Sequence, residues 1–146
     1  MGPAAARAGS AVILCEGGEW EISTPAGIRK PDVFVIPRDI ARAVIVDETP
    51  KVIPGSELLL VAEVISPGSS SERTDRVRKV REYASLGIPQ YWIAGHSPEP
   101  KVQVLALGEN GYVPGVSAAA GAELAADIQA DKPFSVSFDP AALLIF

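Results

Sequence analysis

Residues 57–87, ELLLVAEVISPGSSSERTDRVRKVREYASLG, decide the fold that this sequence predicts. The almost wholly apolar run Leu58–Ile65 predicts a strand buried on both faces, in a sheet that helices cover. One acid interrupts the run, Glu63, and its burial costs free energy unless a cation, a metal or hydrogen-bond donors accompany it. Glu63 is therefore the first candidate for a functional site.

A charged segment with helical spacing follows this strand. A helix is predicted over Glu72–Leu86, after a Ser/Gly-rich loop at 66–71, and Gly87 is typical of the residue that ends a helix. Apolar side chains at helical spacing predict the inward stripe, with Tyr83 beside it: Val77, Val80 and Ala84.

The rest of the chain predicts more strands than helices. Short apolar or alternating runs predict strands over 11–15, 19–23, 32–36, 90–94, 101–107, 112–116 and 134–138. Gly17-Gly18 suits a tight turn between the first two, and Asn110-Gly111 suits a hairpin turn. Loops are expected over 25–31 and 48–56, and a terminal helix after Asp139. Range 38–47 fits either a weak helix or irregular structure, and the Ala-rich range 118–127 is ambiguous. The order predicts an α/β fold with a mixed β-sheet flanked by helices.

Size, charge and cysteine content bound the class of protein. The 146 residues, 47% hydrophobic, predict a single domain over 1–146 with residues 1–10 disordered. A net charge of −5 argues against a protein that coats nucleic acid nonspecifically, but it allows a local basic patch. The single Cys15 cannot form an internal disulfide, so the cytoplasm is the expected compartment. No apolar run reaches the roughly 20 residues of a membrane span, so no membrane partner is expected.

Two acids and a lysine are the main candidates for chemistry. Asp32 begins one predicted strand, Glu63 lies near the end of another, and Lys79 lies on the predicted helix. Proteins hold Mg²⁺ with one or two carboxylates and several waters. The ion activates water for phosphodiester hydrolysis, and a lysine can orient that water or neutralise charge. A loop acid and a surface ion pair between Lys79 and Asp75 are the alternatives, and they do not account for Glu63.

The order of these motifs resembles the Uma-type restriction endonuclease family, within the PD-(D/E)XK nuclease superfamily. The matching pieces lie between about residues 30 and 94, and the closing FSVSFDPAALL is similar to the family's last strand and helix. They are Pro31-Asp32, Glu63-Val64-Ile65-Ser66-Pro67, Asp75, Lys79, Tyr83 and Gly87-Ile88-Pro89-Gln90-Tyr91-Trp92.

The resemblance implies a restriction-endonuclease-like core that cleaves DNA with Mg²⁺ or Mn²⁺. Asp32 and Glu63 would bind the metal together with the backbone carbonyl of Val64, and Lys79 would complete the catalytic set. In the superfamily's simplest pattern the lysine follows the glutamate by two residues, where this chain has Ile65. Lys79 on the helix would therefore take that role.

Further expectations concern the helix and the assembly. Asp75 would support the site without binding the metal, and Arg73 and Arg76 would contact DNA phosphates. A solvated face balanced by acids such as Glu82 is an equally good interpretation of these arginines. A homodimer is expected. The family's N-terminal helical part is expected to be short or absent. The alternative function is a weakened or inactive nuclease-fold domain that acts through self-association or partner binding.

Overall fold

The computed structural model describes residues 9, 11–16, 20–46, 52–65, 70–95 and 99–141. Four predictions fall wholly or largely outside these residues: the disorder over 1–10, the turn at Gly17-Gly18, the loop over 66–71 and the terminal helix after Asp139. The side chains of 70–76 lie outside the description as well, although this segment is helical.

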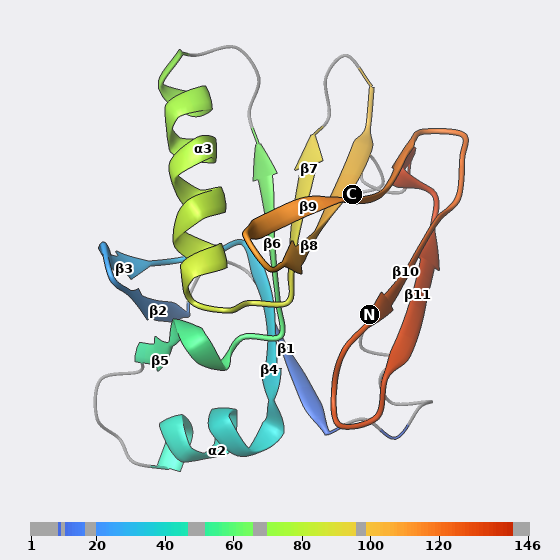
Figure 1. Ribbon diagram of the computed structural model, residues 1–146. Coiled ribbons are helices and arrows are strands. Elements are labelled where there is room, and N and C mark those ends of the chain that lie inside the picture. The colour runs from blue at the N-terminus through green and yellow to red at the C-terminus, as the bar shows by residue number, and fades with distance from the viewer. Residues whose placement is uncertain are drawn as a thin grey trace.

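A six-stranded sheet forms the centre of the molecule, with the strand order β1–β4–β6–β7–β8–β9 (Figure 1). Its strands are β1 Val12–Glu16, β4 Val33–Pro37, β6 Leu60–Ile65, β7 Gln90–Gly95, β8 Lys101–Gly108 and β9 Gly111–Ala119. Neighbouring strands are antiparallel except β6 and β7, which run parallel. A parallel pair needs a crossover connection, and helix α3 (Ser70–Ser85) provides it.

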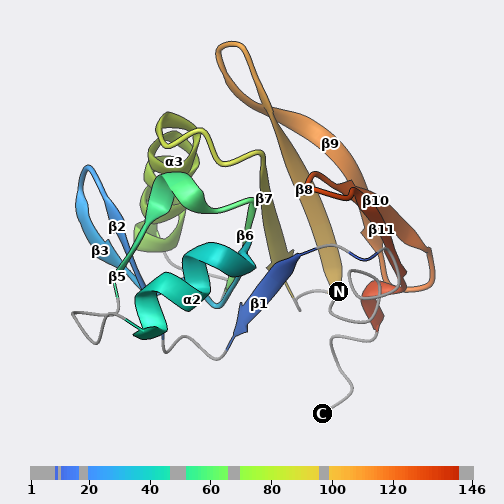
Figure 2. The ribbon, with the colours of Figure 1, turned by 90° about the horizontal axis from the view of Figure 1, so that it is seen from below.

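Helices α2 (Arg38–Val46) and α3 lie on one face of this sheet (Figure 2). A small sheet in the order β3–β2–β5 lies on the same face. Its strands are β2 Glu21–Thr24, β3 Gly27–Arg29 and β5 Val52–Pro54, and a 3₁₀ turn, Gly55–Glu57, follows. No helix in the described part of the chain is long and apolar enough to cross a membrane.

The opposite face of the sheet is covered by a hairpin of β10 (Leu124–Ile128) and β11 (Phe134–Phe138). Two buried clusters result, and β6 contributes Val61 to the cluster on the helix side and Leu60 to the other. The predicted α/β fold with a mixed sheet is confirmed. The prediction that helices cover the sheet holds for one face, because the hairpin takes the other.

Several local predictions were wrong. The expected loop over 25–31 contains β3, and the expected loop over 48–56 contains β5. Strands β1 and β2 belong to different sheets, so they form no hairpin. Strands of three residues are too short for a recognisable alternation, which explains the first two errors. The undecided range 38–47 contains α2, and 118–127 is divided between β9 and β10.

Helix α3 ends as predicted, and its inward side is partly as predicted. Gly87 has a φ of 76° and its N–H donates to the carbonyl of Ala84 at 3.0 Å, as expected at a helix end. Tyr83 is buried and Val80 packs against the core, as expected. Val77, predicted to point inward, is 56% exposed, and Glu82 is buried. Apolar spacing cannot reveal a buried acid.

Strand β9 forms one edge of the main sheet and is irregular. Its pairing with β8 shifts register between Gln103 and Leu105, which marks a bulge. Residues 113–117 are exposed, and Pro114 among them has no backbone N–H to donate.

We expect Gly55→Ala to destabilise the protein more than Gly87→Ala. A Cβ at Gly55 would lie 2.6 Å from the backbone oxygen of Ser23 and 2.7 Å from Leu86. Such overpacking costs up to about 3 kcal/mol. A Cβ at Gly87 meets nothing within 4 Å, so only the left-handed backbone costs free energy, about 1 kcal/mol. Urea unfolding measures both values, and equal losses would contradict this account of Gly55.

Candidate active site

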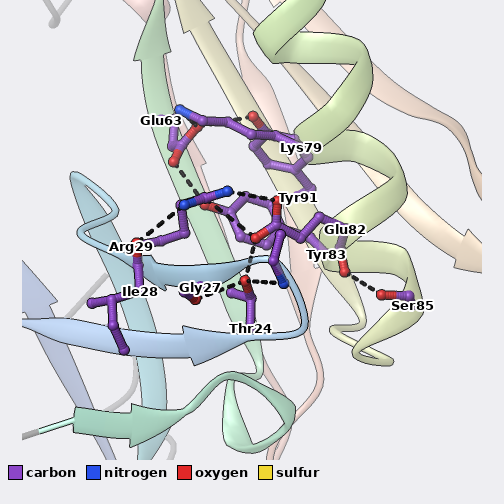
Figure 3. A network of polar contacts seen from close by, with 11 residues as sticks. Thr24, Gly27, Ile28, Arg29, Glu63, Lys79, Glu82, Tyr83, Ser85 and Tyr91 are labelled. Atoms are coloured by element: carbon purple, nitrogen blue, oxygen red, sulfur yellow. Dashed lines mark hydrogen bonds and ion pairs between the residues drawn. The ribbon is translucent and has the colours of Figure 1, made fainter.

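Glu63 on β6 is buried, with 7% of its surface exposed, and its carboxylate has three partners (Figure 3). The Tyr83 hydroxyl donates to Oε1 at 2.9 Å, and the Tyr91 hydroxyl donates to Oε2 at 3.0 Å. The Lys79 ammonium lies 3.1 Å from Oε2. These partners come from α3 and β7, the elements that follow β6 along the chain. The burial cost anticipated for Glu63 is therefore offset by directed donors and a cation.

The two tyrosines form a fixed platform beneath the carboxylate. Tyr83 and Tyr91 are almost fully buried, and their rings meet edge to face, with centroids 5.2 Å apart. Burial, reinforced by the charge of Glu63, raises the pKa of Tyr83 above its ordinary value. The Tyr83 hydroxyl therefore keeps its proton and remains a donor to Glu63.

Helix geometry explains why Lys79 and Tyr83 reach the same acid. Residues four apart lie above one another on one side of an α-helix. Because α3 connects β6 to the parallel strand β7, this side of the helix lies over both strands. Lys79, Tyr83 and Glu63 thus meet within a single strand–helix–strand unit.

Asp32 reaches this region from the neighbouring strand. Its Oδ2 accepts a hydrogen bond from the backbone N–H of Val64 at 2.8 Å. Val33 pairs with Ala62 in the antiparallel ladder, so one further step of that register puts Asp32 opposite Glu63. Opposed residues on adjacent strands place their side chains on the same face. Asp32 and Glu63 therefore emerge side by side on the face that α3 covers.

Strand geometry places the carbonyl of Val64 on the side of β6 that faces Asp32. Within a strand, the N–H and C=O of one residue point toward the same neighbouring strand. Since the Val64 N–H donates to Asp32, the Val64 carbonyl also faces the β4 side, past the first ladder residue of β4, Val33. Among the described residues no donor contacts Asp32 Oδ1, so this oxygen is available for a ligand.

These oxygens fit a hard divalent cation. The described residues contain no group of three or more His, Cys, Asp or Glu side chains that could enclose a metal. Mg²⁺ does not need one, because it keeps several waters and takes one or two carboxylates. The Lys79 ammonium beside Glu63 Oε2 also shows that this position accepts positive charge. The donor set of Asp32, Glu63 and the Val64 carbonyl thus fits Mg²⁺ or Mn²⁺.

A second buried acid lies one helical turn from Lys79. Within the described chain, Glu63 and Glu82 are the two buried charged side chains. Arg29 pairs with Glu82, and the Thr24 hydroxyl donates to it. The interpretation of Glu82 as part of an exposed charged face was therefore wrong.

The structure brings together Asp32, Glu63 and Lys79, and their metal-binding and catalytic roles remain predictions. Asp75, Arg73 and Arg76 lie on α3, but their side chains are outside the described residues. Cys15 is buried, and burial raises the pKa of its thiol to about 11, so it is not a poised nucleophile.

Sequence reasoning missed the partners that make the burial of Glu63 possible. Tyr83 and Tyr91 belonged to the quoted motifs, yet no role was assigned to either hydroxyl. The four-residue spacing from Lys79 to Tyr83 was the available signal for one of them. No local pattern could pair Arg29 with Glu82, because 53 residues separate them.

Two comparisons with known proteins bear on this site. The family model with the description "Uma2: Putative restriction endonuclease" matches residues 5–129. A search of the curated proteins found no match. The matched range includes Asp32, Glu63, Lys79 and both tyrosines.

We expect Tyr83→Phe to lower the free energy of unfolding by about 1.5–3 kcal/mol, the usual value of a hydrogen bond to a charged group. The change leaves Glu63 Oε1 with no donor among the described residues. The control is Tyr112→Phe, because the Tyr112 hydroxyl donates at 2.8 Å to an uncharged acceptor, the Ile88 carbonyl. That loss should be about 1 kcal/mol. Equal losses in urea unfolding would show that the charge of Glu63 contributes nothing.

Proposed function

The chain belongs to the Uma2 family, and we propose that it is a metal-dependent DNA endonuclease that hydrolyses phosphodiester bonds. The observation that carries the proposal is the meeting of Asp32, Glu63 and Lys79 on one face of β4 and β6 beneath α3. A carboxylate pair with a neighbouring lysine matches the needs of phosphodiester hydrolysis at a metal.

Each residue has a distinct role in this proposal. Asp32 and Glu63 would hold Mg²⁺ or Mn²⁺ with the Val64 carbonyl. The bound ion would polarise a phosphoryl oxygen and lower the pKa of a water. Lys79 would orient the attacking water and neutralise charge on the phosphate, from its mount on the rigid helix. Asp75, one turn before Lys79, would support the lysine.

The contact between Lys79 and Glu63 gives the lysine a second role. Without a metal, the ammonium neutralises the buried carboxylate. A divalent cation beside Glu63 would repel that ammonium, and the repulsion would release Lys79 toward the substrate. Cation binding and the Lys79–Glu63 ion pair therefore oppose each other.

One observation favours the second candidate, a nuclease-fold domain without catalysis that acts through self-association or a partner. Glu63 already accepts from Tyr83, Tyr91 and Lys79, the arrangement expected of a buried acid that serves only the structure. The two candidates differ in their affinity for a divalent cation, which the experiments below measure.

DNA binding and assembly complete the proposal. Arg73 and Arg76 on α3 would contact backbone phosphates, and Arg81 on the same helix is exposed. Each phosphate contact should contribute about one unit to the dependence of log K on log salt. The proposed homodimer would suit the cutting of two strands, and light scattering tests it by measuring the molar mass in solution.

We expect the purified protein to nick or linearise plasmid DNA with Mg²⁺ or Mn²⁺ and to be inactive with a chelator. Asp32→Asn, Glu63→Gln and Lys79→Met should each slow cleavage about 100-fold or more, a typical cost of removing one electrostatic contributor. Lys132→Ala, at an exposed residue outside the site, should keep full activity and is the control for effects of substitution that do not involve the site. Full activity in the three site variants would refute the assignment.

Metal binding should separate Lys79 from the acids. We expect Glu63→Gln and Asp32→Asn to weaken Mn²⁺ binding at least as much as the loss of a supporting contact does, roughly 10- to 100-fold. Lys79→Met should bind Mn²⁺ at least as tightly as the unmodified protein, because a competing positive charge is gone. Electron paramagnetic resonance of free Mn²⁺ measures each affinity. No binding at millimolar Mn²⁺ would favour the non-catalytic candidate.

A further inference from the structure

A second buried ion pair lies beside the proposed site, and no role has been assigned to it. Arg29 Nη2 donates to Glu82 Oε2 at 3.4 Å, and Arg29 Nε lies 3.3 Å from Oε1 without forming a hydrogen bond. The Glu82 side chain is 5% exposed and the Arg29 side chain 24%. The Thr24 hydroxyl donates to Glu82 as well, so this acid has three contacts from the β2–β3 hairpin (Figure 3).

Adhesion of the hairpin to α3 does not explain this pair. Two charges that leave water lose solvation, and their mutual attraction often returns no more than that loss. Apolar side chains of similar volume commonly hold two elements together as well or better. What Glu82 gains here is direction, because the hydrogen bonds from Arg29 Nη2 and from the Thr24 hydroxyl require a particular arrangement of donor and acceptor.

The pair joins the two segments that carry Asp32 and Lys79. Arg29 lies three residues before Asp32, and the intervening Pro31 is buried and has a fixed φ. Glu82 lies three residues after Lys79, on the same side of α3. The segment that enters β4 is thereby tied to α3 within one turn of the lysine.

Tyr83 anchors α3 at one point, because its buried ring packs on Tyr91 and its hydroxyl donates to Glu63. The aliphatic side chains of α3 add little: Val77 is 56% exposed, and Val80 is only partly buried. Hydrophobic contact is also non-directional. The Arg29–Glu82 pair adds a second contact, three residues from Lys79 and to a different element, so Tyr83 and Glu82 together hold the helix where Lys79 reaches Glu63.

We propose that Arg29 and Glu82 are positioning residues, which act with Tyr83 to fix the rotation of α3 and keep Lys79 paired with Glu63. Two acids on this face are matched by two cations, Lys79 on Glu63 and Arg29 on Glu82. Without Arg29, the charge of Glu82 would draw Lys79 away, because residues three apart on a helix are neighbours. The catalytic consequence rests on the proposed function, but the placement of Lys79 does not.

The rate at which an amine-reactive acetylating reagent modifies Lys79 tests this placement without any reference to activity. Lys79 is 29% exposed and paired, whereas Lys101 is exposed and serves as the reference lysine in the same peptide mass spectra. We expect Arg29→Met and Glu82→Gln each to raise the Lys79 rate relative to Lys101 by about fivefold, a common size for coupling within one ion-pair network. Mn²⁺ affinity should change in the same two variants.

Matched variants separate positioning from general stability. Glu21→Gln removes the exposed Lys30–Glu21 pair, which is 3.8 Å long, and should leave the Lys79 rate unchanged. The double variant Arg29→Met with Glu82→Gln removes both charges, so Lys79 should return most of the way to its original rate. Arg29→Lys keeps the charge and should lie between the original protein and Arg29→Met.

Two results would overturn the proposal. Lower unfolding free energy in Arg29→Met and Glu82→Gln, with the Lys79 rate and Mn²⁺ affinity unchanged, would make the pair purely structural. If the Lys79 rate in the double variant is no closer to the original rate than in the single variants, the idea that Arg29 keeps Lys79 paired with Glu63 is refuted. If Arg29→Met does not fold, Arg29→Lys and Glu82→Asp give the same comparison. Failure of the proposed function would look different: no cleavage and no Mn²⁺ binding, with the Lys79 rate still responding to Arg29→Met.

Discussion

The arrangement of the helix side of the sheet depends on the burial of one carboxylate. Glu63 lies inside a strand whose neighbours Val61 and Leu60 are fully buried, so water cannot solvate it well. Its hydrogen-bond donors must come from other elements, and Tyr83 and Tyr91 supply them. Both hydroxyls are reached only if α3 crosses from β6 to β7 directly over the acid. The charge at Glu63 thereby constrains the path of the chain as well as its local contacts.

This requirement also explains why α3 is an unusual core helix. Its buried side contains an acid and a tyrosine, while Val77 is exposed. Polar side chains can occupy a buried face when each is satisfied by a partner, and here Glu63 and Glu82 both have theirs. Such networks select one arrangement more sharply than apolar packing does, because an unpaired charge is costly.

The sequence predicted best those elements whose signal is local. The apolar run before Ile65, the strand over 90–94, the hairpin at Asn110-Gly111 and the stop at Gly87 were all predictable from pattern or from turn chemistry. The inward face of α3 was predicted only in part: Val80 and Tyr83 pack there, but hydrophobic periodicity cannot reveal a buried acid such as Glu82. Asp32, Glu63 and Lys79 were found through residue types and motif order. Their hydrogen-bond partners and the Arg29–Glu82 pair depend on contacts between distant segments, which no local pattern encodes.

The bulge in β9 has a consequence for how copies of the chain can assemble. An edge strand with free backbone groups invites another strand to extend the sheet. Here Pro114 offers no N–H, and the register shift opposite Gln103 and Leu105 bends the strand away from a regular ladder. Sheet extension at this edge is therefore disfavoured, which protects the protein from open-ended association. A closed pair of subunits would therefore have to use another surface, such as the opposite edge strand β1 or side chains away from β9.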